Sequence, residues 1–299
     1  MTSQFQEIHW TTTDTTPIRN PATTETQDHR PSHRQNKGTK MAEVHLSRPS
    51  LTTNDSAVLQ ALFDAESSPS GAVTVDVSLP PLPTHLNISL EDYETLKSRE
   101  IFIVKTLQPD SVAQEIVESA IKDFDTIIAE YPTYPSAYAN RAQALRMLVD
   151  MNSSDDTHDT TTSPSLINHN HTETVSRLFA DLGQAISLAT PRSPADPVSA
   201  AQARILADSH THRGYLLLKA AKEKKSALEA SDREVDISNG PDKLRAMDPD
   251  QLEEMASRDF FYGGRYGNQV AQQLAVQTNP YAKMCGAIVK EAMRKELEV

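Results

Sequence analysis

The sequence contains few of the residues and patterns on which several functional classes depend. Among 299 residues there is one cysteine, Cys285, so no intramolecular disulfide can form. The net charge is −12 and neither Lys nor Arg gathers in a dense run, which argues against a nucleic-acid ligand. No apolar run approaches membrane-spanning length, and the N-terminus has neither an apolar signal core nor an acid-poor transit pattern. We therefore expect a cytoplasmic protein that binds neither nucleic acid nor membrane.

Patterns that indicate catalysis are also scarce. The chain has only 9 glycines, and it contains no metalloprotease helix motif, nucleophile elbow or recognisable pair of catalytic carboxylates. The glycine-rich stretch 263–267 is not a phosphate-binding loop, because no strand precedes it and no Lys-Ser or Lys-Thr follows. We interpret it as a close helix crossing followed by a turn. The sequence predicts no enzyme activity and no cofactor.

Two pairs of histidines leave one enzymatic alternative open. His169 and His171, with His210 and His212, could bind a metal ion if the two pairs met in space. Against this, residues 169–171 fall in a predicted loop, no Cys or carboxylate completes a ligand spacing, and His210 occupies a packing position. A metal-dependent enzyme that uses these four histidines remains the alternative to a binding protein.

Polar composition divides the chain into three parts. Residues 1–50 are rich in Thr, Gln, Asn, Pro and His with almost no apolar spacing, which predicts a disordered extension. Residues 51–89 are expected to hold a short docking helix, capped near Asn54, and a Pro- and Ser-rich linker. Residues 90–299 follow a helical pattern and should form the folded domain.

Within residues 90–299 small and large residues recur at spacings typical of tetratricopeptide repeats, in which two helices cross closely. The second-helix positions are Ala120, Phe124 and Ile127, then Leu178, Leu182 and Ala185, then Ala256, Phe260 and Gly263. The first-helix positions are Leu96, Arg99, Glu100 and Ile103, then Tyr138, Arg141, Ala142 and Leu145, then His210, Arg213, Gly214 and Leu217. The small residues Ala142 and Gly214 should lie where backbones approach, whereas Glu100 replaces the small residue in the first copy.

The last part of the chain predicts one more helix. Asn279 can cap it, Pro280 fits its first turn, and apolar residues from Tyr281 to Met293 share one face. Cys285 on that face is expected to be a buried, unreactive side chain. The predicted fold is therefore all-α: a right-handed tetratricopeptide-repeat α-solenoid of about three helical hairpins plus a C-terminal capping helix.

Five segments resemble, in order, landmarks of the tetratricopeptide repeat protein 36 family. They are NDSAVLQALF (54–63), SAYANRAQALRM (136–147), HRG (212–214), ASRDFFYGG (256–264) and NPYAKMC (279–285). The likeness spans about residues 54–293, with insertions near 102–118, 148–173 and 220–254. It implies a cytosolic, co-chaperone-like adaptor whose partner is a seventy-kilodalton heat-shock chaperone or an enzyme of tyrosine catabolism that it protects from degradation.

The repeat positions also indicate which side chains face a partner. The candidates on the concave face are Lys97, Asn140, Gln143, Arg146, His212 and Tyr215, each of which could instead be an ordinary solvated or packing residue. Some repeat proteins of this class grip a terminal carboxylate with Lys, Asn and Arg side chains. Here Ile101, Asp208 and His212 depart from that set. We therefore expect a mixed apolar and polar binding surface that includes Tyr215.

Overall fold

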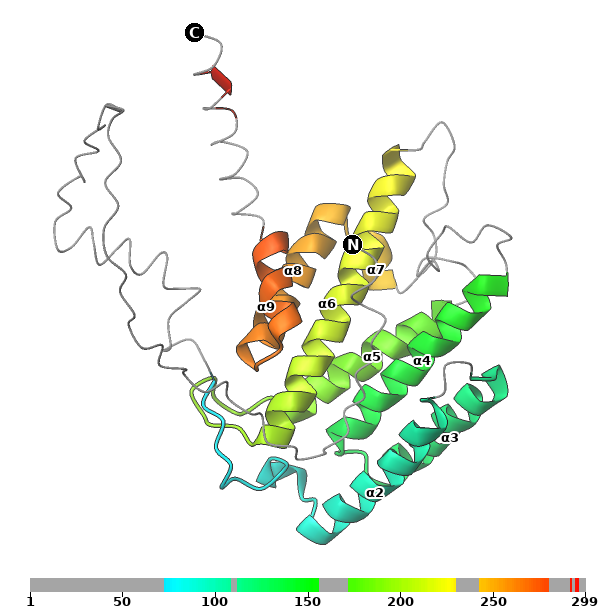
Figure 1. The fold of residues 1–299 in the computed structure, drawn as a ribbon, viewed down its shortest axis with the longest axis vertical. Helices are drawn as coiled ribbons and strands as arrows, with labels where there is room; N and C mark the ends of the chain where they lie inside the picture. Colours follow the sequence, from blue (N-terminus) through cyan, green and yellow to red (C-terminus); the bar gives the residue numbers. More distant parts are fainter. Residues whose placement is uncertain are drawn as a thin grey trace, which may run out of the picture. The chain divides into compact units, whose positions relative to one another are not determined.

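The computed structural model describes residues 73–108, 112–155, 172–229 and 242–279, with Glu291, Arg294 and Lys295. In order, the elements are η3 (Thr84–Leu86), α2 (Leu90–Thr106), α3 (Gln114–Glu130), α4 (Pro135–Asp155), α5 (Thr172–Ala189), α6 (Ala200–Glu229), α7 (Asp242–Ala246), α8 (Pro249–Arg265) and α9 (Gln269–Thr278) (Figure 1). In these ranges the chain is all-α, as predicted. None of these helices combines the length and apolar character needed to cross a bilayer.

Several predictions concern other residues. The extension 1–50, the docking helix near 54–63, Cys285 and the capping helix that would begin after Asn279 lie outside the described residues. The sequence did not predict α9, which packs on α8.

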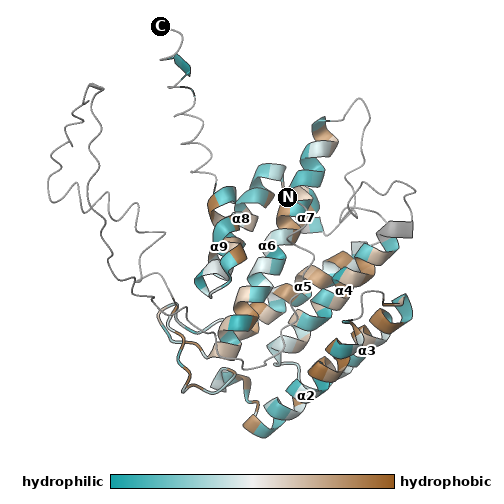
Figure 2. Ribbon diagram, viewed as in Figure 1, coloured by the Kyte–Doolittle hydropathy of each residue, from teal (hydrophilic) through white to brown (hydrophobic). Residues whose placement is uncertain are grey.

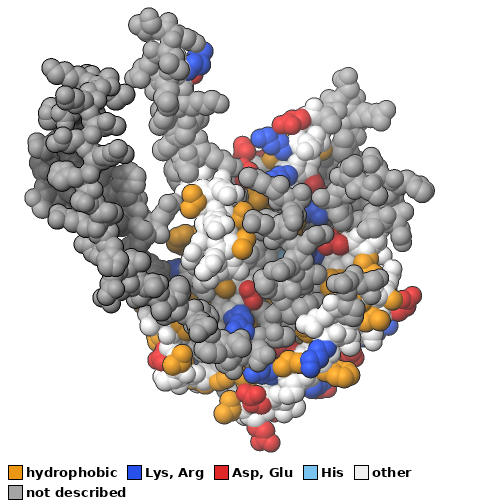
Figure 3. All heavy atoms as spheres, viewed as in Figure 1, with side chains coloured by type: hydrophobic (Ala, Val, Ile, Leu, Met, Phe, Trp, Pro, Cys, Tyr) orange, Lys and Arg blue, Asp and Glu red, His pale blue; other side chains and the backbone are white. Residues whose placement is uncertain are grey.

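Each helix packs on the next along the chain, and α7 is the exception. The contacts run from α2 through α6, then from α6 to α8 and from α8 to α9, and α4 also touches α6 (Figure 1). Hydropathy colouring shows apolar residues concentrated on α3 and α5 (Figure 2). Exposed hydrophobic and charged side chains are interspersed over α2 and α3 (Figure 3). The helices predicted to form hairpins are in contact, α2 with α3, α4 with α5, and α6 with α8, and α3 also packs on α4 and α5 on α6.

Burial follows the predicted repeat positions. Phe124, Leu178 and Phe260 are completely buried, as are the small residues Ala142 and Ala256. Residues three and four apart share one face of a helix, so a repeat of apolar residues at that spacing places all of them in the core. The interior of the three helix pairs is thus confirmed at the level of single positions.

The three stretches interpreted as insertions are largely helical where the structure describes them. Helix α2 continues to Thr106 and α3 starts at Gln114, so both enter 102–118. Likewise α4 continues to Asp155, and α6 continues to Glu229. The stretch AAKEKKSALE at the end of α6 consists mainly of residues with high helix propensity, which explains why this helix extends beyond the repeat pattern.

A lysine holds the short helix α7 against α6. The Nζ of Lys224 donates hydrogen bonds to the carbonyl oxygens of Leu244, Arg245 and Met247 at 2.6, 3.0 and 2.6 Å. Burial lowers the pKa of Lys224. The ammonium group satisfies carbonyls at the end of a helix, where backbone acceptors lack helical partners. Helix α8 then begins with a capping box between Asp248 and Gln251.

Glycines mark the close helix crossings. A Cβ atom at Gly214 would lie 3.0 Å from two ring carbons of Phe260 and 3.2 Å from the carbonyl oxygen of Ala256. A Cβ at Gly263 would lie 2.6 Å from the Oγ1 of Thr211. Gly267 has φ +106°, which favours glycine, in the turn before α9. The predicted close approach at Gly214 and the crossing and turn at 263–267 are confirmed.

We predict that Gly214→Val lowers the free energy of unfolding by about 1–3 kcal/mol, because the added side chain overpacks against the buried Phe260. Gly183→Val in α5 is the matched control, since a Cβ there meets nothing within 4 Å. This control should change stability by less than about 0.5 kcal/mol. Urea unfolding followed by circular dichroism measures both, and equal losses would contradict the crossing geometry.

Candidate functional site

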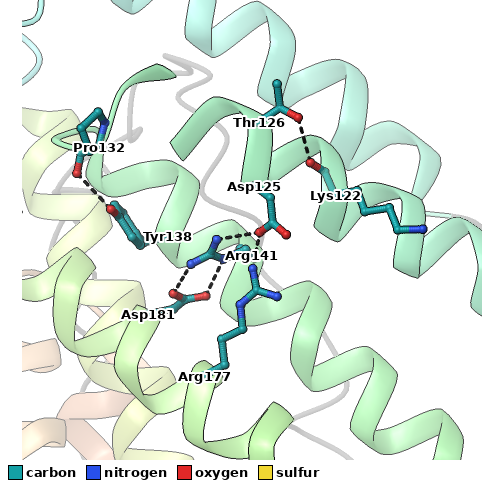
Figure 4. Close-up of polar contacts among 8 residues, drawn as sticks. All are labelled: Lys122, Asp125, Thr126, Pro132, Tyr138, Arg141, Arg177 and Asp181. Atoms are coloured by element: carbon teal, nitrogen blue, oxygen red, sulfur yellow. Dashed lines mark hydrogen bonds and ion pairs between the residues drawn. The ribbon is translucent and has the colours of Figure 1, made fainter. Parts of the chain in front are cut away.

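A buried arginine joins α3, α4 and α5. The Nε and Nη2 atoms of Arg141 on α4 donate to both carboxylate oxygens of Asp181 on α5, at 2.8 and 2.5 Å. Its Nη1 donates to Asp125 on α3 at 2.6 Å, and Arg177 donates to the same oxygen of Asp125 (Figure 4). The guanidinium carbon also lies 5.6 Å from the ring centroid of Tyr138. Arg141 therefore holds three helices together.

The same kind of pair recurs between α6 and α8. Arg213 donates from Nε and Nη2 to the two carboxylate oxygens of Asp259, both at 2.7 Å. The Nδ1 of His210 lies 2.8 Å from the Oδ1 of Asp259. Burial acts to raise the pKa of Asp259, but the hydrogen bonds from Arg213 and His210 hold it below its usual value.

In both pairs the arginine directly precedes the small residue, Ala142 or Gly214. The aspartate directly precedes the large second-helix residue, Leu182 or Phe260. The repeat spacing includes both arginines, but their aspartate partners lie outside the repeat positions. The recurring Asp before the large residue was the pattern that could have revealed them.

The first helix pair departs from this arrangement at Glu100. This carboxylate is buried, and it accepts hydrogen bonds from the Tyr134 hydroxyl at 2.8 Å, the Ser136 hydroxyl at 2.9 Å and the Asn140 amide at 3.1 Å. Burial raises the pKa of Glu100 to about 7, although the three hydrogen bonds oppose this shift. The neighbouring Arg99 pairs instead with Glu130 at the surface.

Asn140 does not lie on an accessible surface, although its repeat position predicts a contact with a partner. Its side chain is completely buried and its amide donates to Glu100, so a partner cannot reach it in this structure. His212 is also buried rather than displayed on a surface. The repeat pattern assigned both residues to the concave face from their positions alone, whereas Glu100 draws one inward and close packing covers the other.

Arg146 and Tyr215 form the part of the predicted surface that the structure brings together. The guanidinium carbon of Arg146 on α4 lies 5.0 Å from the ring centroid of Tyr215 on α6. The Nε of Arg146 also lies 3.5 Å from the carboxylate of Asp150. Arg146 and Tyr215 are partly exposed. So are Gln143, about one turn earlier on α4, and Lys97 on α2. We call Arg146, Tyr215 and Gln143 the α4–α6 surface.

The two histidines of α6 lie on different sides of the helix. His210 contacts Asp259 of α8, whereas His212 lies near Arg146 of α4. Among the described residues neither ring nitrogen of His212 has a hydrogen-bond partner. Burial and the charge of Arg146 lower the pKa of His212 to about 3, so the ring is neutral at physiological pH.

This geometry bears on the metal-dependent alternative. His210 and His212 do not converge on one ion, and His169 and His171 lie outside the described residues. In the described ranges no three His, Cys, Asp or Glu side chains gather as metal ligands would.

A cavity of about 440 Å³ lies between α5, the segment 190–199, α6 and α8. Its lining includes Ile186, His210, Arg213, Arg258, Tyr262 and Arg265. The ring of His210 lies 5.2 Å from that of Tyr262, and Arg258 lies over the Tyr262 ring at 6.0 Å. The stretch 256–264 of α8 is one of the family landmarks, but the sequence does not predict the cavity, because its walls come from segments far apart in the chain.

Taken together, the fold and these sites define an all-α protein of successively packed helices, in which a bidentate arginine–aspartate pair ties α4 to α5 and another ties α6 to α8. The chain is 66% identical to the L-tyrosine degradation gene cluster protein hmgX of Aspergillus fumigatus over 257 residues. The aligned region covers 85% of this chain and 96% of that protein. It belongs to the family of that protein. No protein-family model matches the chain, and no solved structure matches it.

The ionisation of Glu100 predicts a pH-dependent stability. The unfolded state releases this proton above its ordinary pKa of 4.5, whereas the folded state keeps it until about pH 7. Rising pH therefore favours unfolding across this window, by on the order of 3 kcal/mol, and has no further effect above it. Glu100→Gln should remove this part of the pH dependence. Unfolding free energies at pH 4.5, 6 and 7.5 measure it, and parallel profiles for the two proteins would contradict the buried acid.

The Arg141–Asp181 pair predicts a large mutational cost. Asp181→Ala should lower the free energy of unfolding by about 3 kcal/mol or more, because it leaves the buried guanidinium without its bidentate partner. Replacing both residues, as Arg141→Met with Asp181→Leu, should recover much of that loss. Glu130→Ala at the exposed Arg99 pair is the control and should change little. A double variant as unstable as Asp181→Ala would argue against the charge explanation.

Proposed function

We propose that this protein is a non-enzymatic scaffold of the tetratricopeptide type that holds a protein partner in tyrosine degradation. The observation that carries the proposal is the Arg146–Tyr215 contact, which places a cation and an aromatic ring side by side across α4 and α6. Arginine and tyrosine are the side chains that most often dominate the binding energy of protein interfaces. The relative is named as a protein of an L-tyrosine degradation gene cluster, which supports the link to tyrosine degradation.

The polar side chains of the helix pairs favour a scaffold over an enzyme. Arg141 and Arg213 are engaged with carboxylates of the following helices. Glu100 is engaged with hydroxyl and amide donors. The two arginine contacts tie helices within a pair, and the Glu100 contacts join α2 of the first pair to the start of the second. Successive pairs with small residues at the crossings agree with the right-handed solenoid that the repeat spacing predicts.

Two partners fit the family resemblance, an enzyme of tyrosine catabolism and a seventy-kilodalton heat-shock chaperone. We favour the enzyme, because binding to a chaperone tail would depend on a carboxylate clamp. Lys97 fits that clamp, but Asn140 is buried, and its three other donors are replaced by Ile101, Asp208 and His212. The partner is therefore held by a mixed apolar and polar surface, in the cytoplasm.

We expect Tyr215→Ala to weaken partner binding by roughly thirty-fold, the loss typical of an aromatic hot spot, and Lys97→Ala to weaken it by less than about three-fold. The full chain serves as bait for the enzymes of tyrosine catabolism, each purified separately, and affinity is measured at low and high salt. Affinity should fall only modestly with salt, because buried apolar area is not screened.

Phe261→Ala is the matched control, since it removes an exposed aromatic ring from α8 and leaves the α4–α6 surface intact. Circular dichroism of each variant separates lost binding from lost folding. The proposal is wrong if affinity collapses with salt and Lys97→Ala abolishes binding while Tyr215→Ala does not. A clamp for a chaperone tail would then replace it.

A further inference from the structure

The cavity between α5, α6 and α8 carries more positive charge than its own carboxylate balances. Arg213 is neutralised by Asp259, whose two oxygens are both engaged by it. Arg258 and Arg265 also line the cavity, and in the described part of the chain neither lies within ion-pair distance of a carboxylate. A cavity with two guanidinium groups left over attracts an anion.

Arg265 is the sharper of these two observations. Its Nε is buried and has no hydrogen-bond partner among the described residues, and its Nη2 reaches the Pro194 carbonyl only at 3.4 Å. A buried donor without an acceptor costs free energy that a bound acceptor would recover. Guanidinium groups favour carboxylates, since they present parallel donors to two oxygens.

The remaining walls are aromatic and apolar. The ring of His210 stacks on Tyr266 with centroids 6.3 Å apart and an interplanar angle of 12°, and it is tilted against Tyr262 at 5.2 Å. Ile186 and Pro191 add apolar surface. A volume of about 440 Å³ lies within the range of small-molecule sites. These walls fit a flat ring better than a compact inorganic anion.

We propose that this cavity binds a small aromatic carboxylate, with Arg258 and Arg265 holding the carboxylate and Tyr262 and Tyr266 flanking the ring. The proposal goes beyond the scaffold function, because it assigns a ligand site on the side of α6 that faces α8. The α4–α6 surface lies on another side of the same helix. Each site can therefore be tested while the other stays intact.

The test is isothermal titration calorimetry of the full chain with phenylacetate and with phenylacetamide, which has the same ring and size but no charge. We expect phenylacetate to bind at least about ten-fold more tightly than the amide. Arg258→Gln and Arg265→Gln should each weaken phenylacetate binding by about ten-fold. Arg99→Gln, which removes a guanidinium from the exposed pair with Glu130, is the matched control and should leave binding unchanged.

Arg258 is exposed, so its variant tests the proposal even if Arg265→Gln disturbs folding. A peptide with a free C-terminal carboxylate distinguishes the second source of the same chemistry. The proposal is overturned if phenylacetate does not bind, if the amide binds equally well, if Arg258→Gln has no effect, or if the peptide binds more tightly than phenylacetate. Partner capture by the α4–α6 surface is measured separately, so either proposal can fail alone.

Discussion

The bidentate contact between an arginine and a buried aspartate on a neighbouring helix is the interaction on which the packing depends. Transferring two charges out of water is costly, and only close, well-aligned hydrogen bonds recover that cost. Directly after Arg141, the completely buried Ala142 has almost no side chain and leaves room for a neighbouring helix to approach. Gly214 does the same beside Arg213 and Asp259. The small residue and the charged pair therefore act together, because the small residue permits a short distance between the helices and the hydrogen bonds of the pair require it.

Glu100 shows how the packing changes when a larger side chain replaces the small residue. A carboxylate at this position cannot fit a close crossing with α3, and it points instead to the start of α4, where Tyr134, Ser136 and Asn140 donate to it. Unlike Arg141 and Arg213, Arg99 pairs with an exposed carboxylate, that of Glu130. The first helix pair therefore meets the second at a buried polar cluster, which adds to the apolar core that the two pairs share.

The sequence predicted the helix pairs and their crossings well, because burial on a helix has a period that single residues such as Phe124 and Phe260 reveal. It failed where side-chain contacts join distant segments. Asn140 fits a surface position by spacing, and only the carboxylate 40 residues earlier explains its burial. The cavity was missed for the same reason, since His210 and Arg258 come from different helices. Pairwise polar contacts do not follow the helical period, and of those described here only the arginine–aspartate pairs leave a recurring trace, an Asp directly before Leu182 and before Phe260.

Helix geometry also accounts for how the candidate sites divide around α6. Successive residues turn by about 100°, so side chains two positions apart point in nearly opposite directions. His210 and Arg213 consequently face α8 and the cavity, whereas His212 and Tyr215 face α4. Because α6 is one continuous helix, and Gly214 packs it tightly against Phe260, its two sides cannot shift independently. The His-x-His spacing that suggested a metal site is therefore the spacing that assigns two histidines to two different interfaces.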